Sequence, residues 1–212
     1  MLALMGKTGI TNRVRNKGSM PRISTRKLKE LILYIAQKSD GDIKFGSTKL
    51  NKLLLFSDML YFAETGGSIT GVKYEKKQFG PVPTNIYTVK NEMISRDGSM
   101  VVVPKEEAIG MVRKVPTALR RPDLTVFTAE EIATVDAVIR TFEDLNNSEI
   151  SAYSHNRIAN WDYIPIGHEV PLSVILYPAK TKLTSEDKSF FRNLLRSTEW
   201  GQQLIHARGA EA

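Results

Sequence analysis

The 212-residue chain contains no cysteine and only three histidines. The lack of cysteine excludes disulfides, thiolate catalysis and cysteine-ligated zinc or iron–sulfur sites, and it fits a reducing compartment such as the cytosol. His155, His168 and His206 are far apart, and none has a partner at a metal-ligand spacing such as His-Glu-x-x-His. We therefore expect no metal site and no cofactor.

Long hydrophobic runs are missing as well. No segment approaches the roughly 18 apolar residues that a membrane-spanning helix needs. The N-terminus also lacks the contiguous apolar core of a signal peptide. These two absences predict a cytoplasmic protein that does not enter a membrane.

Common catalytic motifs are a third absence. The chain has no Gly-x-Gly-x-x-Gly before a helix, no phosphate loop and no Gly-x-Ser-x-Gly turn. Ser154 and His155 are adjacent, and adjacent residues on a helix point apart, so they are not expected to form a nucleophile and base pair. We predict that the protein is not an enzyme and has no catalytic residue. The rival hypothesis, a hydrolase or transferase, would require Asp58 and His155 to converge.

Positive charge is concentrated at the N-terminus. The chain has 30 basic and 23 acidic residues, a formal net charge of +7. Residues 1–29 hold eight of the basic residues and no acidic one, which leaves 22 basic and 23 acidic residues in the other 183. Because the body is nearly neutral, nucleic acid is not expected to be the main partner. A nucleic-acid-binding autoregulator that is anchored by the basic arm stays as an alternative.

What the sequence does contain is a strong helical pattern. Its content of 42% hydrophobic and 25% charged residues is typical of a globular protein that is large enough to bury a core. Thr128 and Glu131 form a capping-box pattern, and other segments carry hydroxyl caps or glycine stops. Residues 48–65 are apolar around almost the whole helix, so this helix is expected to be central. The predicted helices cover about residues 24–41, 48–65, 86–96, 129–142, 147–154 and 184–205.

The strand signals are weaker. Alternating residues between 69 and 75 predict short strands joined by a turn at Thr70 and Gly71. Phe79 to Pro83 is expected to be a rigid non-helical connection, because prolines lack an amide donor and restrict the preceding residue. Residues 101–103 and 111–115 are candidates for a second strand pair.

These elements predict an α+β fold, namely a mainly helical single domain with a small antiparallel sheet from the 69–78 region. The domain is expected to span residues 23–178. We predict a basic flexible arm before it, at 1–22, and a C-terminal helical extension after it, at 179–212.

The largely apolar 48–65 helix carries two polar residues whose spacing is informative. Asn51 and Asp58 are seven apart, which places them on one face about two turns apart. Buried polar groups need partners. They either bind a ligand or partner, or they hydrogen-bond a neighbouring loop.

Three segments are informative when they are read together. They are Lys49–Asp58 (KLNKLLLFSD), Gly67–Pro83 with its ending Phe79-Gly80-Pro81-Val82-Pro83, and Leu145–Gly167 with Ser154-His155 and Trp161. Over about residues 27–177 the chain resembles the SocA-like Panacea domain of antitoxins, although Leu55 stands where a tyrosine is usual in that family.

The resemblance implies an antitoxin that neutralises a cognate protein toxin, encoded by the adjacent gene, through direct contact. It also implies an alternative, because one family member is described as an adaptor that delivers its toxin to a protease. The family supplies no catalytic residues to carry over. The residues that we expect to contact a partner are Asn51, Asp58, Tyr74, Phe79, Gly80, Pro81, Val82 and Trp161.

Overall fold

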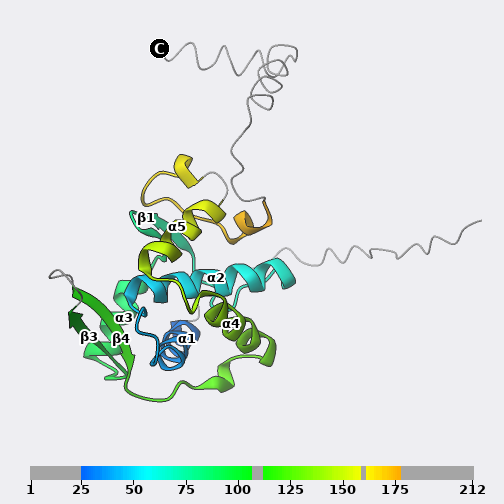
Figure 1. Ribbon diagram of the computed structural model, residues 1–212. Coiled ribbons are helices and arrows are strands. Elements are labelled where there is room, and N and C mark those ends of the chain that lie inside the picture. Colours follow the sequence, from blue (N-terminus) through cyan, green and yellow to red (C-terminus); the bar gives the residue numbers. More distant parts are fainter. Residues whose placement is uncertain (1–24, 107–111, 159–160, 178–212) are drawn as a thin grey trace, which may run out of the picture.

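The computed structural model describes residues 25–106, 112–158 and 161–177 of the chain (Figure 1). The predicted arm, the C-terminal extension and the helix expected from residue 184 lie outside these residues. The described part is a mainly helical α+β domain with two small antiparallel sheets of two strands each. Its elements are α1 (Thr25–Lys38), α2 (Ser47–Thr65), β1 (Tyr74–Lys77), β2 (Gly80–Pro83), α3 (Ile86–Ser95), β3 (Met100–Glu106), β4 (Val112–Ala118), α4 (Ala129–Phe142) and α5 (Asn147–Arg157), with short 3₁₀ turns η2 (Leu124–Val126), η3 (Trp161–Tyr163) and η4 (Leu172–Leu176).

Helix α2 is the central element, as its apolar circumference predicts. It crosses the middle of the domain and contacts α1, α4, α5, both hairpins and η4 (Figure 1). It ends at Gly66, whose positive φ of 73° allows its amide to bond the carbonyl of Phe62. The core around it is made of buried aliphatic and aromatic side chains, among them Leu31, Leu50, Leu54, Met59, Val135 and Ile150.

Strands β1 and β2 form a hairpin where the sequence predicts only a rigid connection after Gln78. The prolines are compatible with pairing because of their register. The Thr84 amide bonds the Lys73 carbonyl at 2.9 Å, so alternate residues of β2, at 82 and 80, turn their backbone groups towards β1. Pro81 and Pro83 turn theirs away, where no amide donor is needed.

The turn predicted at Thr70 and Gly71 lies within residues 69–72, but the short strand predicted before it, at Ile69, is not formed. This segment is a bent loop, and the first strand begins only at Tyr74. The loop departs from the alternating pattern because Asp58 accepts hydrogen bonds from both the amide and the hydroxyl of Thr70. The Asp58 carboxylate thus satisfies backbone and side-chain donors that would otherwise need a partner strand.

Strands β3 and β4 confirm the second predicted pair. Val103 faces Val115 and Pro104 faces Lys114 in an antiparallel register, and residues 107–111 between the strands lie outside the described part. Helix α3 packs against β3, and α1 packs against β4. This hairpin therefore forms one side wall of the domain.

The predicted helix starts of α4 and α5 are largely confirmed. Thr128 and Glu131 form the expected capping box at α4. Helix α5 begins at Asn147, as predicted, with Asn146 as its cap, and it continues to Arg157, beyond the predicted end at about Ser154. Both caps satisfy first-turn amides that would otherwise lack acceptors.

Three of the eight N-terminal basic residues belong to α1 and have acidic partners. Arg26 pairs with Asp123 at 2.6 Å, Lys27 with Glu131 at 2.5 Å, and Lys29 with Asp97 at 2.8 Å. These cations connect α1 to the rest of the domain, so the basic arm is smaller than the charge count suggests.

Candidate functional site

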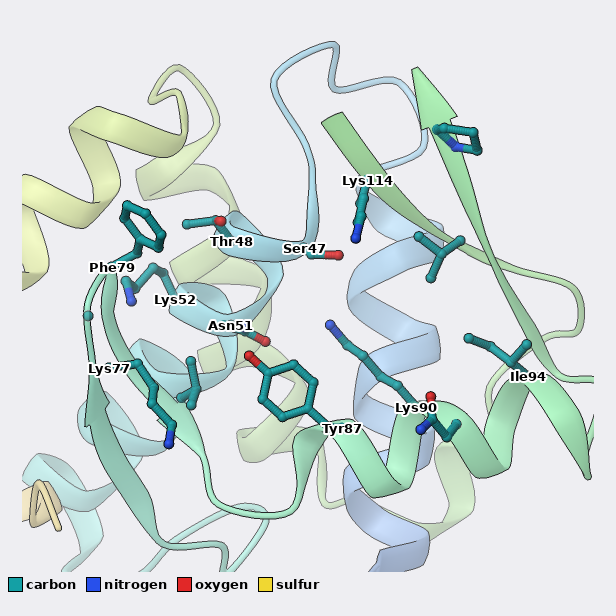
Figure 2. Close-up of a pocket in the computed structure, with 15 residues that line it drawn as sticks. Ser47, Thr48, Asn51, Lys52, Lys77, Phe79, Tyr87, Lys90, Ile94 and Lys114 are labelled. Atoms are coloured by element: carbon teal, nitrogen blue, oxygen red, sulfur yellow. The ribbon is translucent and has the colours of Figure 1, made fainter. Parts of the chain in front are cut away.

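A pocket of about 670 Å³ lies between the N-terminal half of α2, the β1–β2 hairpin, α3 and the β3–β4 hairpin (Figure 2). Its volume is in the range of small-molecule sites. Phe79 and Tyr87 stand at its mouth and are 65% and 66% exposed. Its full lining is Ser47, Thr48, Asn51, Lys52, Lys77, Phe79, Gly80, Val82, Tyr87, Lys90, Asn91, Ile94, Val102, Pro104 and Lys114.

The charge of this lining is one-sided. Four lysines line the pocket, one from each of its walls, and no acidic residue does. Lys77 has an ion pair with Glu75 at 2.9 Å. Among the ion pairs within the described residues, none involves Lys52, Lys90 or Lys114. The pocket is therefore a concentration of positive charge on a body that is nearly neutral.

Lys52 is the most deeply placed of the four. Its side chain is 1% exposed, and its Nζ donates one hydrogen bond, at 3.2 Å, to the Pro81 carbonyl. Burial lowers the pKa of Lys52 to about 7. Burial also lowers the pKa of Lys90 to about 8. Both shifts have the same cause, because no counter-ion compensates for the loss of water around the ammonium group.

The three segments that carry the family resemblance meet at Lys52. A Cβ on Gly80 would lie 2.3 Å from Lys52 Nζ and 3.0 Å from Ser154 Oγ. Gly80 also has a φ of 103°, which only glycine adopts without strain. The first segment thus supplies the lysine, the second the glycine that lets it approach, and the third the buried serine.

Trp161 and His155 form the next layer. Their rings stack with centroids 4.4 Å apart, and Lys76 Nζ lies 4.4 Å from the Trp161 centroid. Burial, together with the charges of Lys52 and Lys76, lowers the pKa of His155. Its Nε2 is buried without a hydrogen-bond partner, so the ring is held by stacking.

Asp58 has a structural role instead. The side chain is fully buried and accepts from Ser68 Oγ at 2.8 Å, from the Thr70 amide at 3.0 Å and hydroxyl at 2.5 Å, and from Tyr74 Oη at 2.7 Å. Burial raises its pKa while these donors oppose the rise. This is the loop-binding alternative that the sequence left open. The four bonds leave His155 without a hydrogen bond to Asp58, so the pair that the enzyme hypothesis requires is not formed.

The structure divides the predicted partner-contacting residues into two groups. Asn51, Phe79, Gly80 and Val82 line the pocket. Asp58, Tyr74 and Trp161 are buried in the networks described above, and Pro81 is buried with its carbonyl on Lys52. A partner would reach this second group only after the surrounding loops had moved.

Sequence reasoning missed the lysines and Tyr87. Lys52, Lys77, Lys90 and Lys114 come from four different elements and have no common spacing. The only available signal was Lys52 itself, a charged residue on a helix that is apolar on nearly all sides.

Two further features of the described residues bear on function. No helix there is long and apolar enough to span a bilayer. No three His, Asp or Glu side chains gather there in a way that would hold a metal ion.

Comparisons with known proteins give one positive result. Neither the curated proteins nor the solved structures contain a match to the chain. The family of SocA-like antitoxins with a Panacea domain matches residues 50–162, a region that contains both hairpins, α3, α4, α5 and all but the first three residues of α2. Because this match covers more than half of the 212 residues, the chain belongs to the SocA-like Panacea domain family of antitoxins.

Proposed function

We propose that this protein is the antitoxin of a toxin–antitoxin pair, and that it neutralises its toxin by binding it through the face around the pocket mouth. Family membership supports the antitoxin part of the proposal. The observation that carries the choice of face is the pair of aromatic side chains, Phe79 and Tyr87, which are both exposed and both line the pocket (Figure 2).

These two side chains are suited to anchor a partner. Phe79 lies at the turn of the β1–β2 hairpin, and Tyr87 lies in the first turn of α3, next to the fully buried Ile86. Because the hairpin and the helix already order the backbone at both positions, little backbone entropy is lost on binding. Large aromatic residues near the centre of an interface contribute much of its binding energy.

We place the action in the cytosol and take it to be binding rather than catalysis. The Asp58 carboxylate is already bonded to its own loop, and Ser154 donates to the Ser151 carbonyl, which leaves no nucleophile and base pair among Asp58, Ser154 and His155. The two alternatives, a protease adaptor and a nucleic-acid-binding autoregulator, predict different results in the experiment below.

The test is co-expression with the product of the adjacent gene. Expression of that product alone should stop growth, and this protein should restore growth and co-purify with it. An adaptor would instead lower the cellular amount of the toxin, and an autoregulator would lower its transcript. A harmless neighbour, or a toxic one that this protein does not bind, would contradict the antitoxin proposal.

The docking face has its own test. The Phe79→Ala/Tyr87→Ala variant should bind the toxin at least about tenfold more weakly, since aromatic anchors dominate interface energies. The control is Tyr163→Ala, which removes an 82% exposed tyrosine outside the pocket. Thermal stability is measured for every variant. Full binding by the double variant, with loss in the control, would place the interface elsewhere while leaving the antitoxin function intact.

A further inference from the structure

We propose that the pocket lined by Lys52, Lys90 and Lys114 binds a small phosphate-bearing molecule with an aromatic base, the chemistry of a nucleoside polyphosphate. This site goes beyond toxin binding and is a property of the free protein. Figure 2 shows Lys90 and Lys114 reaching into the pocket from one side, with Asn51 and Tyr87 between them and Lys52.

The positive charge of Lys52 is not compensated by a carboxylate of the described residues. A buried lysine normally has a carboxylate partner, as Lys49 on the same helix has in Asp42 at 2.6 Å. Lys52 is equally buried and has only a carbonyl. Adding an anion to the pocket would supply the missing counter-charge, and it would favour the protonated form of both Lys52 and Lys90.

Helix α2 directs its N-terminal end towards the pocket. Ser47 and Thr48, its first two residues, line the pocket. The residue before them, Gly46, provides no side-chain cap, and in the first turn Asn147 Oδ1 accepts from the amide of Lys49 at 3.2 Å. The positive end of the helix dipole therefore adds to the field of the lysines, an arrangement that favours phosphate oxygens.

The number of lysines and the shape of the pocket lining also favour a nucleotide. Ammonium groups on several walls match a group with many oxygens better than they match a single carboxylate from a partner. The exposed Tyr87 ring and the apolar Ile94 and Val102 provide a flat, non-polar surface beside the charges. A purine base can stack there while its phosphates reach the lysines.

The experiment is calorimetric titration of the full-length protein with ATP, pyrophosphate and adenosine at low salt. ATP should bind most tightly, pyrophosphate more weakly, and adenosine least. The Lys90→Met/Lys114→Met variant should weaken ATP binding by about tenfold or more, because it removes two ammonium groups from the site. Tyr87→Leu should reduce the affinity for ATP to that for pyrophosphate.

The control is Lys73→Met/Lys105→Met, which removes the same net charge. Lys73 is exposed and paired with Glu169. Lys105 is exposed on β3 next to Pro104, and successive residues of a strand face opposite sides, so it points away from the pocket. This variant should bind ATP within about twofold of the wild type, because exposed charges contribute little to a distant site.

Three results would overturn the proposal. They are no binding of ATP or pyrophosphate at millimolar concentration, equal loss in the pocket and control variants, and binding of a glutamate-rich peptide in place of nucleotides. The last result would assign the pocket to acidic side chains of a protein partner. None of these measurements involves the toxin, so their failure would leave the antitoxin proposal standing.

Discussion

Two lysines less than one turn apart on α2 have opposite environments. Lys49 and Lys52 are both 1% exposed. Lys49 Nζ bonds Asp42 at 2.6 Å and the Glu143 carbonyl at 2.7 Å, whereas Lys52 has one carbonyl at 3.2 Å and faces the pocket. Lys49 therefore stabilises the fold through its ion pair, whereas Lys52 is held at the pocket without an ion pair of its own in the described part of the chain.

Asp58 shows that this fold can satisfy a buried charge when the charge is structural. Three of its four donors come from Ser68 and Thr70 in the loop that follows α2, and the fourth is Tyr74 at the start of β1. The same domain leaves the buried Lys52 ammonium group without a counter-ion among the residues that the structure describes. This arrangement lowers the free energy of unfolding. Perturbed, unpaired groups in a cavity are typical of binding sites.

The largest expected effect is that of Lys49→Met. Removing one partner of a buried pair leaves Asp42 without its cation, and we expect a loss of about 4 kcal/mol in the free energy of unfolding. Lys52→Met removes a charge that has no counter-ion, so at pH 7 it should not lower the free energy of unfolding by more than about 1 kcal/mol. Urea denaturation measures both variants. Equal losses would contradict the contrast between the two lysines.

Gly80→Ala should have the next largest effect. Its φ of 103° is strained for alanine, and the new Cβ would meet Lys52 Nζ. We expect a loss of about 3 kcal/mol, from backbone strain and displacement of the lysine. Gly167→Ala is the matched control, because Gly167 has a φ of 84° and open space around it. Thermal unfolding should show a smaller loss in the control, and Lys52→Met should relieve part of the Gly80→Ala defect.

The pH dependence of stability should follow Lys52. Its pKa is about 7 in the folded protein against 10.5 as the ordinary value, so between these limits the unfolded chain binds more protons. Stability therefore rises with pH, by about 2 kcal/mol between pH 7 and 9. Lys90 adds to the rise above about pH 8, while the raised pKa of Tyr74 keeps its buried hydroxyl protonated. Lys52→Met should remove most of the rise in a urea series, and an unchanged slope would refute the assignment.

The smallest effect is expected for an exposed pair. Lys73 and Glu169 are 2.7 Å apart, with side chains 49% and 50% exposed. Lys73→Met should change the free energy of unfolding by less than about 0.5 kcal/mol, because water screens the pair. A loss comparable to that of Lys49→Met would mean that burial does not explain the difference between the lysines.

Helix positions were predictable because their signals are local. The Thr128 and Glu131 cap, the Gly66 stop and the apolar circumference of α2 each act within a few residues along the chain. The β1–β2 hairpin was missed for a related reason. Prolines in a strand are tolerated or excluded according to which side faces the partner strand, and this side is known only from the register.

The sequence by itself determined a cysteine-free, mainly helical domain with a basic N-terminus, and its three motif segments indicated the antitoxin family. Only the tertiary structure decided which buried polar residues are used within the fold and which are free to bind a ligand. Asp58 is satisfied by a loop that folds back on it, and the four pocket lysines meet because α2, β1, α3 and β4 pack around one hollow. Charge sums over the chain cannot reveal such a site, because a local field depends on distances between side chains that are far apart in sequence.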